Sequence, residues 1–467
     1  MLQERKKDVR IGLEIHGYLA TKEKLFCRCR AVRHAAKQEI KPNSFVCPIC
    51  TGQPGSKPML PNAQAIRKII EIALMLNCKI NTVEQKKNLA WQRKHYNWPD
   101  LPKGYQNTIS GAYSVPVAEN GTFESIGIRE IHLEEDPASW NPETGCIDYN
   151  RSGLPLAEIV TEPDFSSAEE VIEWLNKLVL TLSYIKAVDR NAGIKADVNV
   201  SIGEQAGGKR AEIKNLNSIE NIKKAIVFEI ERQKKEGTFL ETRRFDEQSG
   251  KTMKMREKEE AEDYRFIPDP DLPVIKISEK AVKEISEGLP ESPQEKLQKL
   301  VKKHRIDKKS AEVLSQNLEI VEFFEAVSEK IPAEFALPWV VIELLRVLNW
   351  NKKTLEEVDI KPEHFAELLE AVKQGKITEL KAKQILNDFV PSSFSIKEKL
   401  KSSGRITDKN EIEKIIKKVI DRNKQAVSDF REGKKEALNF LLGEIMKESE
   451  RRADYKTARE MLARILG

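Results

Sequence analysis

The sequence lacks any long hydrophobic run. No apolar stretch approaches the roughly 20 residues that a helix needs to span a bilayer, so no membrane-spanning segment is expected. The charged first residues are not followed by an apolar segment either, and we therefore expect no secretory signal and a cytoplasmic location. Cysteine is also scarce. The six cysteines in 467 residues are not expected to form disulfides in a reducing compartment.

Net charge is absent from most of the chain. The 79 basic and 74 acidic residues leave a charge of +5. After Leu400 there are 17 lysines and arginines against 12 acids, so the first 400 residues are neutral. A basic C-terminal segment on a neutral body predicts a polyanionic partner. A chain of this length also exceeds the usual size of a single core, so more than one domain is expected.

Three consecutive acids follow a predicted strand at residues 126–133. These acids and the proline that closes the group are Glu134, Glu135, Asp136 and Pro137. Adjacent acids are tolerated where a cation, a cationic substrate group or water takes up their charge. For any one triplet of acids, a solvated acidic loop is the more common explanation. However, Glu158 stands alone in the apolar run 157–160, where an unpaired acid is costly to bury.

Two further strands carry polar side chains on one face. Residues 9–16 alternate with period two, which places Glu14 and His16 on the same face. Such a pair can share a metal ion, although a surface pair on an edge strand would look the same. Residues 194–202 alternate as well, and their polar face is either a solvent face or the floor of a polar site. That face carries Lys195, Asp197, Asn199 and Ser201.

Four of the cysteines form two close pairs. They are Cys27, Cys29, Cys47 and Cys50. Two pairs across a polar loop predict a structural zinc knuckle, and scattered buried thiols are the alternative. Cys78 and Cys146 stand alone and are expected to be free thiols.

The segment 91–106 is dense in aromatics, prolines and cations and has no periodicity. Its aromatic content predicts a structured loop. Lys94 and Lys103 could hold phosphate, and the aromatic rings could stack on a base. A packed connecting loop is the alternative.

The order of predicted elements indicates an α+β protein. Paired strands alternate with helices at 63–75, 167–185 and 219–235 up to about residue 290, which predicts an antiparallel-sheet domain over 1–292. The remainder is helical in pattern. A break at Ser402, Ser403 and Gly404 divides it into an all-α domain over 293–404 and a small all-α tail over 405–467.

Several long motifs, in order along the chain, resemble one known family. They are Ile11–Gly12–Leu13–Glu14–Ile15–His16, Pro99 to Gln106, His132 to Asp136, Asp148 to Arg151, Glu158 to Asp164 and Glu212 to Ser218. The family is the B subunit of the aspartyl/glutamyl-tRNA amidotransferase. The matches run from residue 10 to about 275 and resume weakly at 439–447. The chain is too short to hold the extra domain of the archaeal E-type relative, which favours the B type.

The resemblance implies a reaction and a set of partners. The implied enzyme is a glutamine-hydrolysing carbon–nitrogen ligase that repairs mischarged Glu-tRNA(Gln), Asp-tRNA(Asn) or both. ATP phosphorylates the side-chain carboxylate, and ammonia from an amidase A subunit displaces the phosphate. A small C subunit completes a heterotrimer, and the matching aminoacyl-tRNA synthetase is a further expected partner. The implied fold is a cradle domain that bears the site, a helical domain and a tail that touches tRNA.

The resemblance also implies cofactors and site residues. Magnesium would help a carboxylate attack an anionic phosphate, and the zinc would be structural. The implied magnesium shell is Glu14, His16, Glu135 and Glu158, with Glu134 as the alternative to its neighbour. Near the phosphate and the ammonia path the resemblance places Lys94, Tyr96 and Lys103.

The end of the chain departs from the family pattern. Residues 448–452 read Glu-Ser-Glu-Arg-Arg where the family usually has a Gly-Lys-Ala-type segment, which puts the tail contacts in doubt. A rival interpretation is a catalytically silent tRNA-binding scaffold in which the acids are only structural. ATP-dependent phosphorylation of Glu-tRNA would separate the two.

Overall fold

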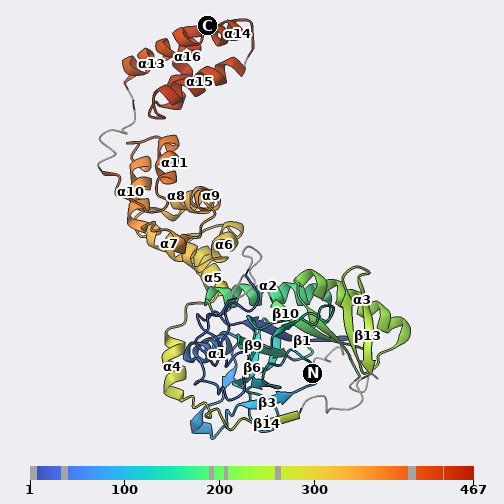
Figure 1. The fold of residues 1–467 in the computed structure, drawn as a ribbon. Coiled ribbons are helices and arrows are strands. Elements are labelled where there is room, and N and C mark those ends of the chain that lie inside the picture. The colour runs from blue at the N-terminus through green and yellow to red at the C-terminus, as the bar shows by residue number, and fades with distance from the viewer. Residues whose placement is uncertain are drawn as a thin grey trace, which may run out of the picture. The chain divides into compact units, whose positions relative to one another are not determined.

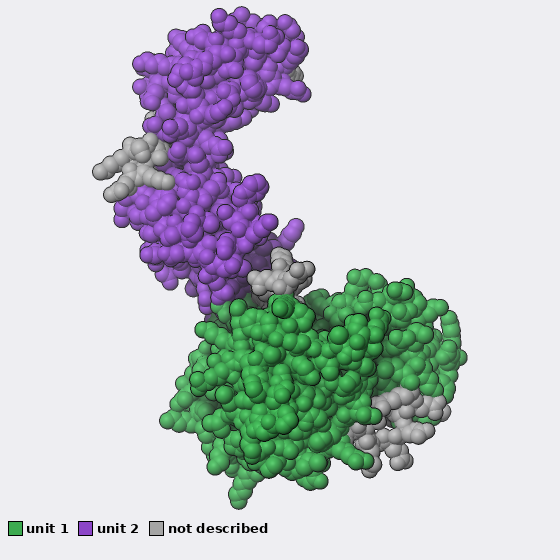
Figure 2. Space-filling view, viewed as in Figure 1, with its two compact units in different colours: residues 1–292 green, residues 293–467 purple. Residues whose placement is uncertain are grey.

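The computed structural model describes residues 8–32, 40–188, 194–203, 209–257, 265–397, 406, 408–434 and 436–467. The chain divides into two compact units, residues 1–292 and 293–467 (Figure 2). The break predicted at 402–404 lies outside the described residues.

One large sheet forms the body of the first unit (Figure 1). In order across it lie β13 (Lys251–Glu257), β12 (Glu241–Asp246), β11 (Ala211–Leu216), β10 (Ile194–Ile202), β1 (Val9–Tyr18), β9 (Pro155–Thr161), β6 (Ile126–Glu135), β4 (Gln106–Thr108), β3 (Gln92–His95) and β14 (Arg265–Pro268). Beside β6 the sheet continues through β5 (Ala118–Phe123) and β2 (Lys79–Ile80). A separate hairpin pairs β7 (Ser139–Trp140) with β8 (Ile147–Asp148).

The predicted α+β class with an antiparallel sheet is confirmed, with one exception in the pairing. The pair β11 and β12 is parallel. Helix α3 (Ile219–Glu236) connects these two strands. A parallel pair requires such a long crossover, because a tight hairpin can only return the chain in the opposite direction.

The two faces of this sheet differ in polarity. On β1, Ile11, Leu13 and Ile15 are buried in the apolar core. The same core contains side chains of α1 (Ala63–Met75), α2 (Ala168–Tyr184) and α3, so these helices cover one face of the sheet. The alternate positions of β1 include Glu14 and His16. Because side chains alternate along a strand, polar residues gather on the other face.

Side-chain caps begin the three covering helices. Asn62 accepts hydrogen bonds from the backbone of Gln64 and Ala65, and α1 then runs over the predicted residues. Ser167 and Ser218 cap α2 and α3 in the same way. Two further elements of this unit are η1 (Val83–Gln85) and α4 (Glu279–Glu287).

Helices make up the regular elements that are described in the second unit. They are α5 (Pro293–His304), α6 (Lys308–Ser315), α7 (Leu318–Ser328), α8 (Ala333–Pro338), η3 (Trp339–Leu344), α9 (Leu345–Trp350), η4 (Leu355–Glu357), α10 (Pro362–Lys373), α11 (Glu379–Asn387), α13 (Lys409–Arg422), α14 (Lys424–Arg431), α15 (Glu436–Glu448) and α16 (Tyr455–Leu466). The helices up to α11 share one apolar core, and α13 to α16 share another.

Leu178→Ala tests whether the covering helices hold the sheet domain together. Leu178 on α2 is fully buried, and truncation of a buried leucine costs about 2–5 kcal/mol. We expect a lower midpoint of thermal unfolding for the first unit, measured by calorimetry. Asn176→Ala, at an exposed position of the same helix, is the matched control and should leave the midpoint nearly unchanged. Equal midpoints for the two variants would contradict this packing.

Candidate functional site

The strand register brings polar side chains from three adjacent strands together. His16 on β1 lies opposite Glu158 on β9, and Glu158 lies opposite His132 on β6. Glu134 follows His132 by two positions and therefore shares its face. One ligand atom each of His16, Glu134 and Glu158 lies within 4.8 Å of the others. We call these three residues the central trio.

Glu134 is the most deeply buried member of the central trio, at 2% exposure. Its Oε2 accepts a hydrogen bond of 3.2 Å from Gln106 Nε2. Its Oε1 has no hydrogen-bond partner among the described residues, and the ammonium of Lys94 lies 3.9 Å from it. Burial by itself raises the pKa of Glu134, but the nearby Lys94, a hydrogen bond with the Thr108 side chain and the nearby histidines outweigh burial and lower the pKa. Glu134 is therefore an ionised carboxylate with one oxygen open to a ligand.

The donor set of the central trio suits a divalent cation. Carboxylates are typical ligands of Mg²⁺ and Mn²⁺, and imidazole binds transition ions. The open oxygen of Glu134 fits this interpretation, because a buried carboxylate oxygen without a donor is costly unless a cation meets it.

His132 adds a positive charge beside the central trio. Its Nε2 lies 3.0 Å from Glu130 Oε2, and its Nδ1 lies 3.1 Å from the Ile109 carbonyl. Burial opposes protonation, but Glu130, Glu158 and Glu134 outweigh it and raise the pKa of His132 to about 9. His132 is therefore an imidazolium near neutral pH, with both ring nitrogens donating.

A second acidic group adjoins the central trio on β1, β10 and β11. Ligand atoms of Glu14, Asp197 and Glu212 lie within 4.8 Å of one another. The Lys214 ammonium forms ion pairs with Asp197, at 2.8 Å, and with Glu212. Burial opposes the charge on Lys214, yet these two acids raise its pKa. Burial and the neighbouring acids raise the pKa of Glu14 despite Lys214. Lys214 thus supplies the countercharge in this second group.

The structure brings Glu134, and not Glu135, to His16 and Glu158. Strand β6 continues to Glu135, so the two adjacent acids point to opposite faces. Glu135 Oε1 lies 2.5 Å from Lys103 Nζ and accepts a hydrogen bond of 2.9 Å from the Asn107 backbone. The geometry therefore departs from the expected shell at two positions, since Glu14 falls in the second group. The roles of these residues stay predictions.

The segment 91–106 is more regular than the sequence indicated, because it contains β3 and the first residue of β4. Pairing of β3 with β4 places Lys94 opposite Gln106. Lys94 therefore lies beside Glu134 of the central trio. Lys103 instead forms an ion pair with Glu135 and donates a hydrogen bond of 2.7 Å to Asn107 Oδ1. Tyr96 follows β3 directly and interacts with Asp100, a neighbour of Asp136 and Arg151. Lys94 is thus the lysine of this segment that faces the central trio.

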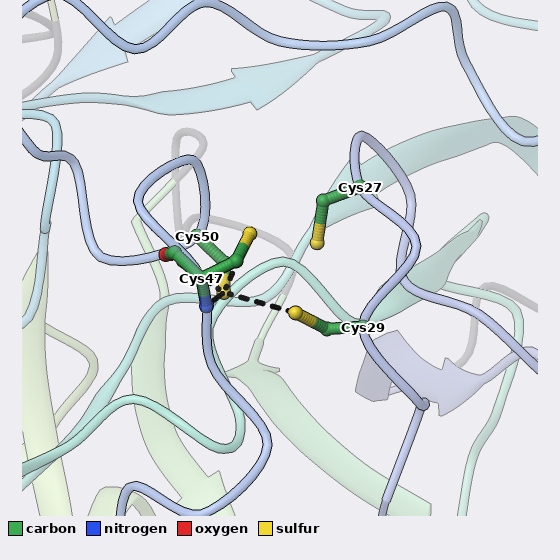
Figure 3. Close-up of side chains that lie close together, drawn as sticks. All are labelled: Cys27, Cys29, Cys47 and Cys50. Atoms are coloured by element: carbon green, nitrogen blue, oxygen red, sulfur yellow. Dashed lines mark hydrogen bonds between the residues drawn. The ribbon is translucent and has the colours of Figure 1, made fainter.

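The four paired cysteines lie together (Figure 3). All four sulfurs are within 4.8 Å of one another, and Cys50 Sγ is 3.9 Å from Cys47 Sγ and 4.0 Å from Cys29 Sγ. A tetrahedral zinc ion with bonds of about 2.3 Å separates its sulfurs by about 3.8 Å. A hydrogen bond with Cys27 lowers the pKa of Cys50 to about 5. The four residues can therefore hold a metal such as zinc.

Among the described helices, none combines the length and the hydrophobicity that are needed to cross a bilayer.

Comparison with known proteins places the chain in a family. The GatB/GatE catalytic domain model matches residues 9–283, and the GatB domain model matches residues 322–466. The chain is 43% identical to the aspartyl/glutamyl-tRNA(Asn/Gln) amidotransferase B subunit of Methanopyrus kandleri, over 97% of this chain and 98% of that protein. The corresponding protein of Methanocaldococcus jannaschii is 43% identical, with 97% of both chains covered. That of Methanothermobacter thermautotrophicus is 41% identical over 97% of this chain and 99% of its own. Since the relatives match nearly from end to end, the chain belongs to the family of aspartyl/glutamyl-tRNA(Asn/Gln) amidotransferase B subunits.

Proposed function

We propose that the chain amidates mischarged Glu-tRNA(Gln), Asp-tRNA(Asn) or both, in an ATP-dependent reaction. In the first step a side-chain carboxylate oxygen forms a bond to the γ-phosphorus of ATP, and the electron pair of the broken bond leaves with ADP. In the second step the ammonia nitrogen bonds to the activated carbonyl carbon, phosphate leaves with the electron pair of the broken carbon–oxygen bond, and the proton lost by the nitrogen goes to the phosphate. The observation that supports this proposal is the central trio, where a buried, ionised carboxylate holds one oxygen open on the polar face of the sheet.

His16, Glu134 and Glu158 would hold a Mg²⁺ ion. When bound, the ion would offset the negative charge of the phosphate oxygens that a carboxylate must approach. This set differs from the expected shell in two ways. Glu134 takes the place of Glu135, and Glu14 is left out because it lies in the second acidic group with Lys214.

The surrounding residues prepare the charge of this site. Lys94 stands 3.9 Å from Glu134 Oε1 and is positioned to meet a phosphate oxygen on the same face. His132 lies opposite Glu158 and donates to Glu130, and this hydrogen bond lowers the pKa of Glu130. Lys103 fixes Glu135 at the end of β6 and Asn107 on β4. In this proposal Lys103 and Tyr96 shape the segment through which the substrate and ammonia approach.

The proposed enzyme works in a complex. The names of the relatives include a subunit letter and two tRNAs, which supports a complex of several subunits that acts on tRNA(Gln) or tRNA(Asn). In this proposal the other subunits are an amidase A subunit and a small C subunit. The matching synthetase is a further candidate. The test is to combine the chain with the amidase and small subunits and to supply each mischarged tRNA with ATP and glutamine. Amidated tRNA with matching ATP hydrolysis is expected, whereas tRNA binding without ATP hydrolysis would favour the silent scaffold.

Glu134→Gln and Glu135→Gln together test the assignment of the metal ligands. The two variants are made separately. Glu134→Gln removes the charge of a proposed ligand and should weaken Mn²⁺ binding to the purified chain by about a hundredfold or more, as measured by electron paramagnetic resonance. Changes to residues outside the metal shell already weaken metal binding by about 10–100-fold. Glu135→Gln should retain Mn²⁺, since its carboxylate meets Lys103. The opposite order of effects would restore Glu135 as the ligand.

Cys47→Ser tests the zinc site. We expect one zinc ion per parent chain by elemental analysis, and loss of zinc with a lower unfolding midpoint in the variant. Structural zinc is worth on the order of 10–16 kcal/mol in small fingers, and a large domain buffers part of that loss. Cys146→Ser, at an exposed cysteine away from the cluster, is the control and should keep its zinc. A parent protein without zinc would refute the site.

Truncation after Leu400 tests whether the tail holds the tRNA. It removes the five excess positive charges, together with the separate apolar core of α13 to α16. Some tail cations are paired internally, such as Lys418 with Glu448 and Lys434 with Asp429, so only the others can meet phosphates. We expect weaker tRNA binding. The slope of log affinity against log salt concentration should become shallower by about one for each lost phosphate contact, while the partner amidase still hydrolyses glutamine. Equal affinities and equal salt slopes would show that the tail is only solubilising surface.

A further inference from the structure

Lys195 lies next to the central trio but has no place in the chemistry described so far. It stands on β10 directly opposite His16 on β1. Side chains of opposite residues in an antiparallel pair lie on the same face, with Cβ atoms about 4.5–5.5 Å apart. Lys195 therefore borders the central trio on the side away from Glu158, which pairs with His16 from β9.

The surroundings of the Lys195 ammonium are polar but contain no direct countercharge. Its Nζ lies 3.5 Å from the Tyr18 hydroxyl and 5.8 Å from the centre of that ring. The Tyr18 hydroxyl donates a 2.7 Å hydrogen bond to Asp136 Oδ2, and Arg151 Nε lies 3.2 Å from the same oxygen. Asp136 is thus already engaged by two other groups. Among the described residues, no carboxylate oxygen lies within 4 Å of Lys195 Nζ, which distinguishes it from the fully paired Lys214.

This arrangement is costly for a lysine without an anionic ligand. Lys195 is half-buried, and burial lowers its pKa, an effect that Asp136 opposes and Arg151 strengthens. A partly desolvated ammonium is stabilised when an anion meets it. A cation held by the neighbouring central trio would contact the same anion from its other side. A group with several anionic oxygens can bridge the two positions, and a phosphoryl group meets this requirement.

We propose that Lys195 binds the transferred phosphoryl group, first as the γ-phosphate of ATP and then as the acyl phosphate on the tRNA-bound side chain. This inference rests on the proposed function. Lys195 donates to a non-bridging oxygen while the carboxylate oxygen bonds to phosphorus and ADP departs, and no proton leaves the lysine. The Tyr18 hydroxyl, which Asp136 holds in place, orients the Lys195 ammonium.

The test compares two nucleotides as inhibitors of tRNA-dependent ATP hydrolysis by the full complex with its partner subunits. The β,γ-imido analogue of ATP carries the γ-phosphate, and ADP lacks it. For Lys195→Met we expect the inhibition constant of the analogue to rise by about tenfold to a hundredfold, as for loss of a charged hydrogen bond, and that of ADP to stay nearly unchanged. Lys195→Arg should recover most of the loss. Lys251→Met, at an exposed position of β13, is the control and should behave as the parent.

Two results would overturn the inference: an equal loss for both nucleotides, or no loss for the analogue. The first would mean that Lys195 only shapes the site, and the second that it only packs against Tyr18. Mn²⁺ binding and the unfolding midpoint of each variant report on distortion, and if Lys195→Met is distorted, Lys195→Gln replaces it in the same comparison. A parent complex without tRNA-dependent ATP hydrolysis would instead refute the proposed function, so the two failures are distinguishable.

Discussion

Repulsion between carboxylates on one face of a sheet is the constraint on which the rest of this structure depends. Helices bury the other face in an apolar core, so the alternation of side chains leaves Glu14, Glu134, Glu158, Asp197 and Glu212 on the polar face. Partly buried acids at such spacing need cations. The chain answers this need in different ways along the face.

The two acidic groups differ in where their countercharge comes from. Lys214 is built into the second group and pairs with Asp197 and Glu212. The cations of the central trio are less closely paired. Lys94 lies 3.9 Å from Glu134, and His132, opposite Glu158, donates to Glu130. A group that contains its own ammonium is suited to support, and a group that leaves a carboxylate oxygen open is suited to bind a cation together with a substrate. We propose that closely spaced acids on this sheet have different roles for this reason.

Local patterns predicted much of the fold, because they depend on neighbouring residues alone. Asn62 and the apolar spacing after it predicted α1 at the residues where it occurs, and alternation predicted the strands at 9–16 and 194–202. The segment 91–106 was harder, since β3 also pairs with β14, which lies far along the chain. The parallel pair of β11 and β12 likewise follows from a tertiary crossover and not from a local signal.

The candidate site was predicted in composition but not in arrangement. Glu14, His16 and Glu158 were identified from unusual acids and histidines in strands, and the cysteines from their spacing. The choice between Glu134 and Glu135 depends on whether the strand continues past Leu133, which sequence does not reveal. The sequence predicted that Lys195 lies either on a solvent face or on the floor of a polar site, and Lys214 entered only as part of the motif from Glu212 to Ser218. Their neighbours depend on the register between β10, β1 and β11.

The most direct test of this account is a crystal structure of the complex with Mn²⁺ and the β,γ-imido analogue of ATP, measured at the manganese absorption edge. We predict an anomalous peak among His16, Glu134 and Glu158, with the γ-phosphate between that peak and Lys195. A peak among Glu14, Asp197 and Glu212 with Lys214 displaced, or no manganese on this face of the sheet, would contradict it.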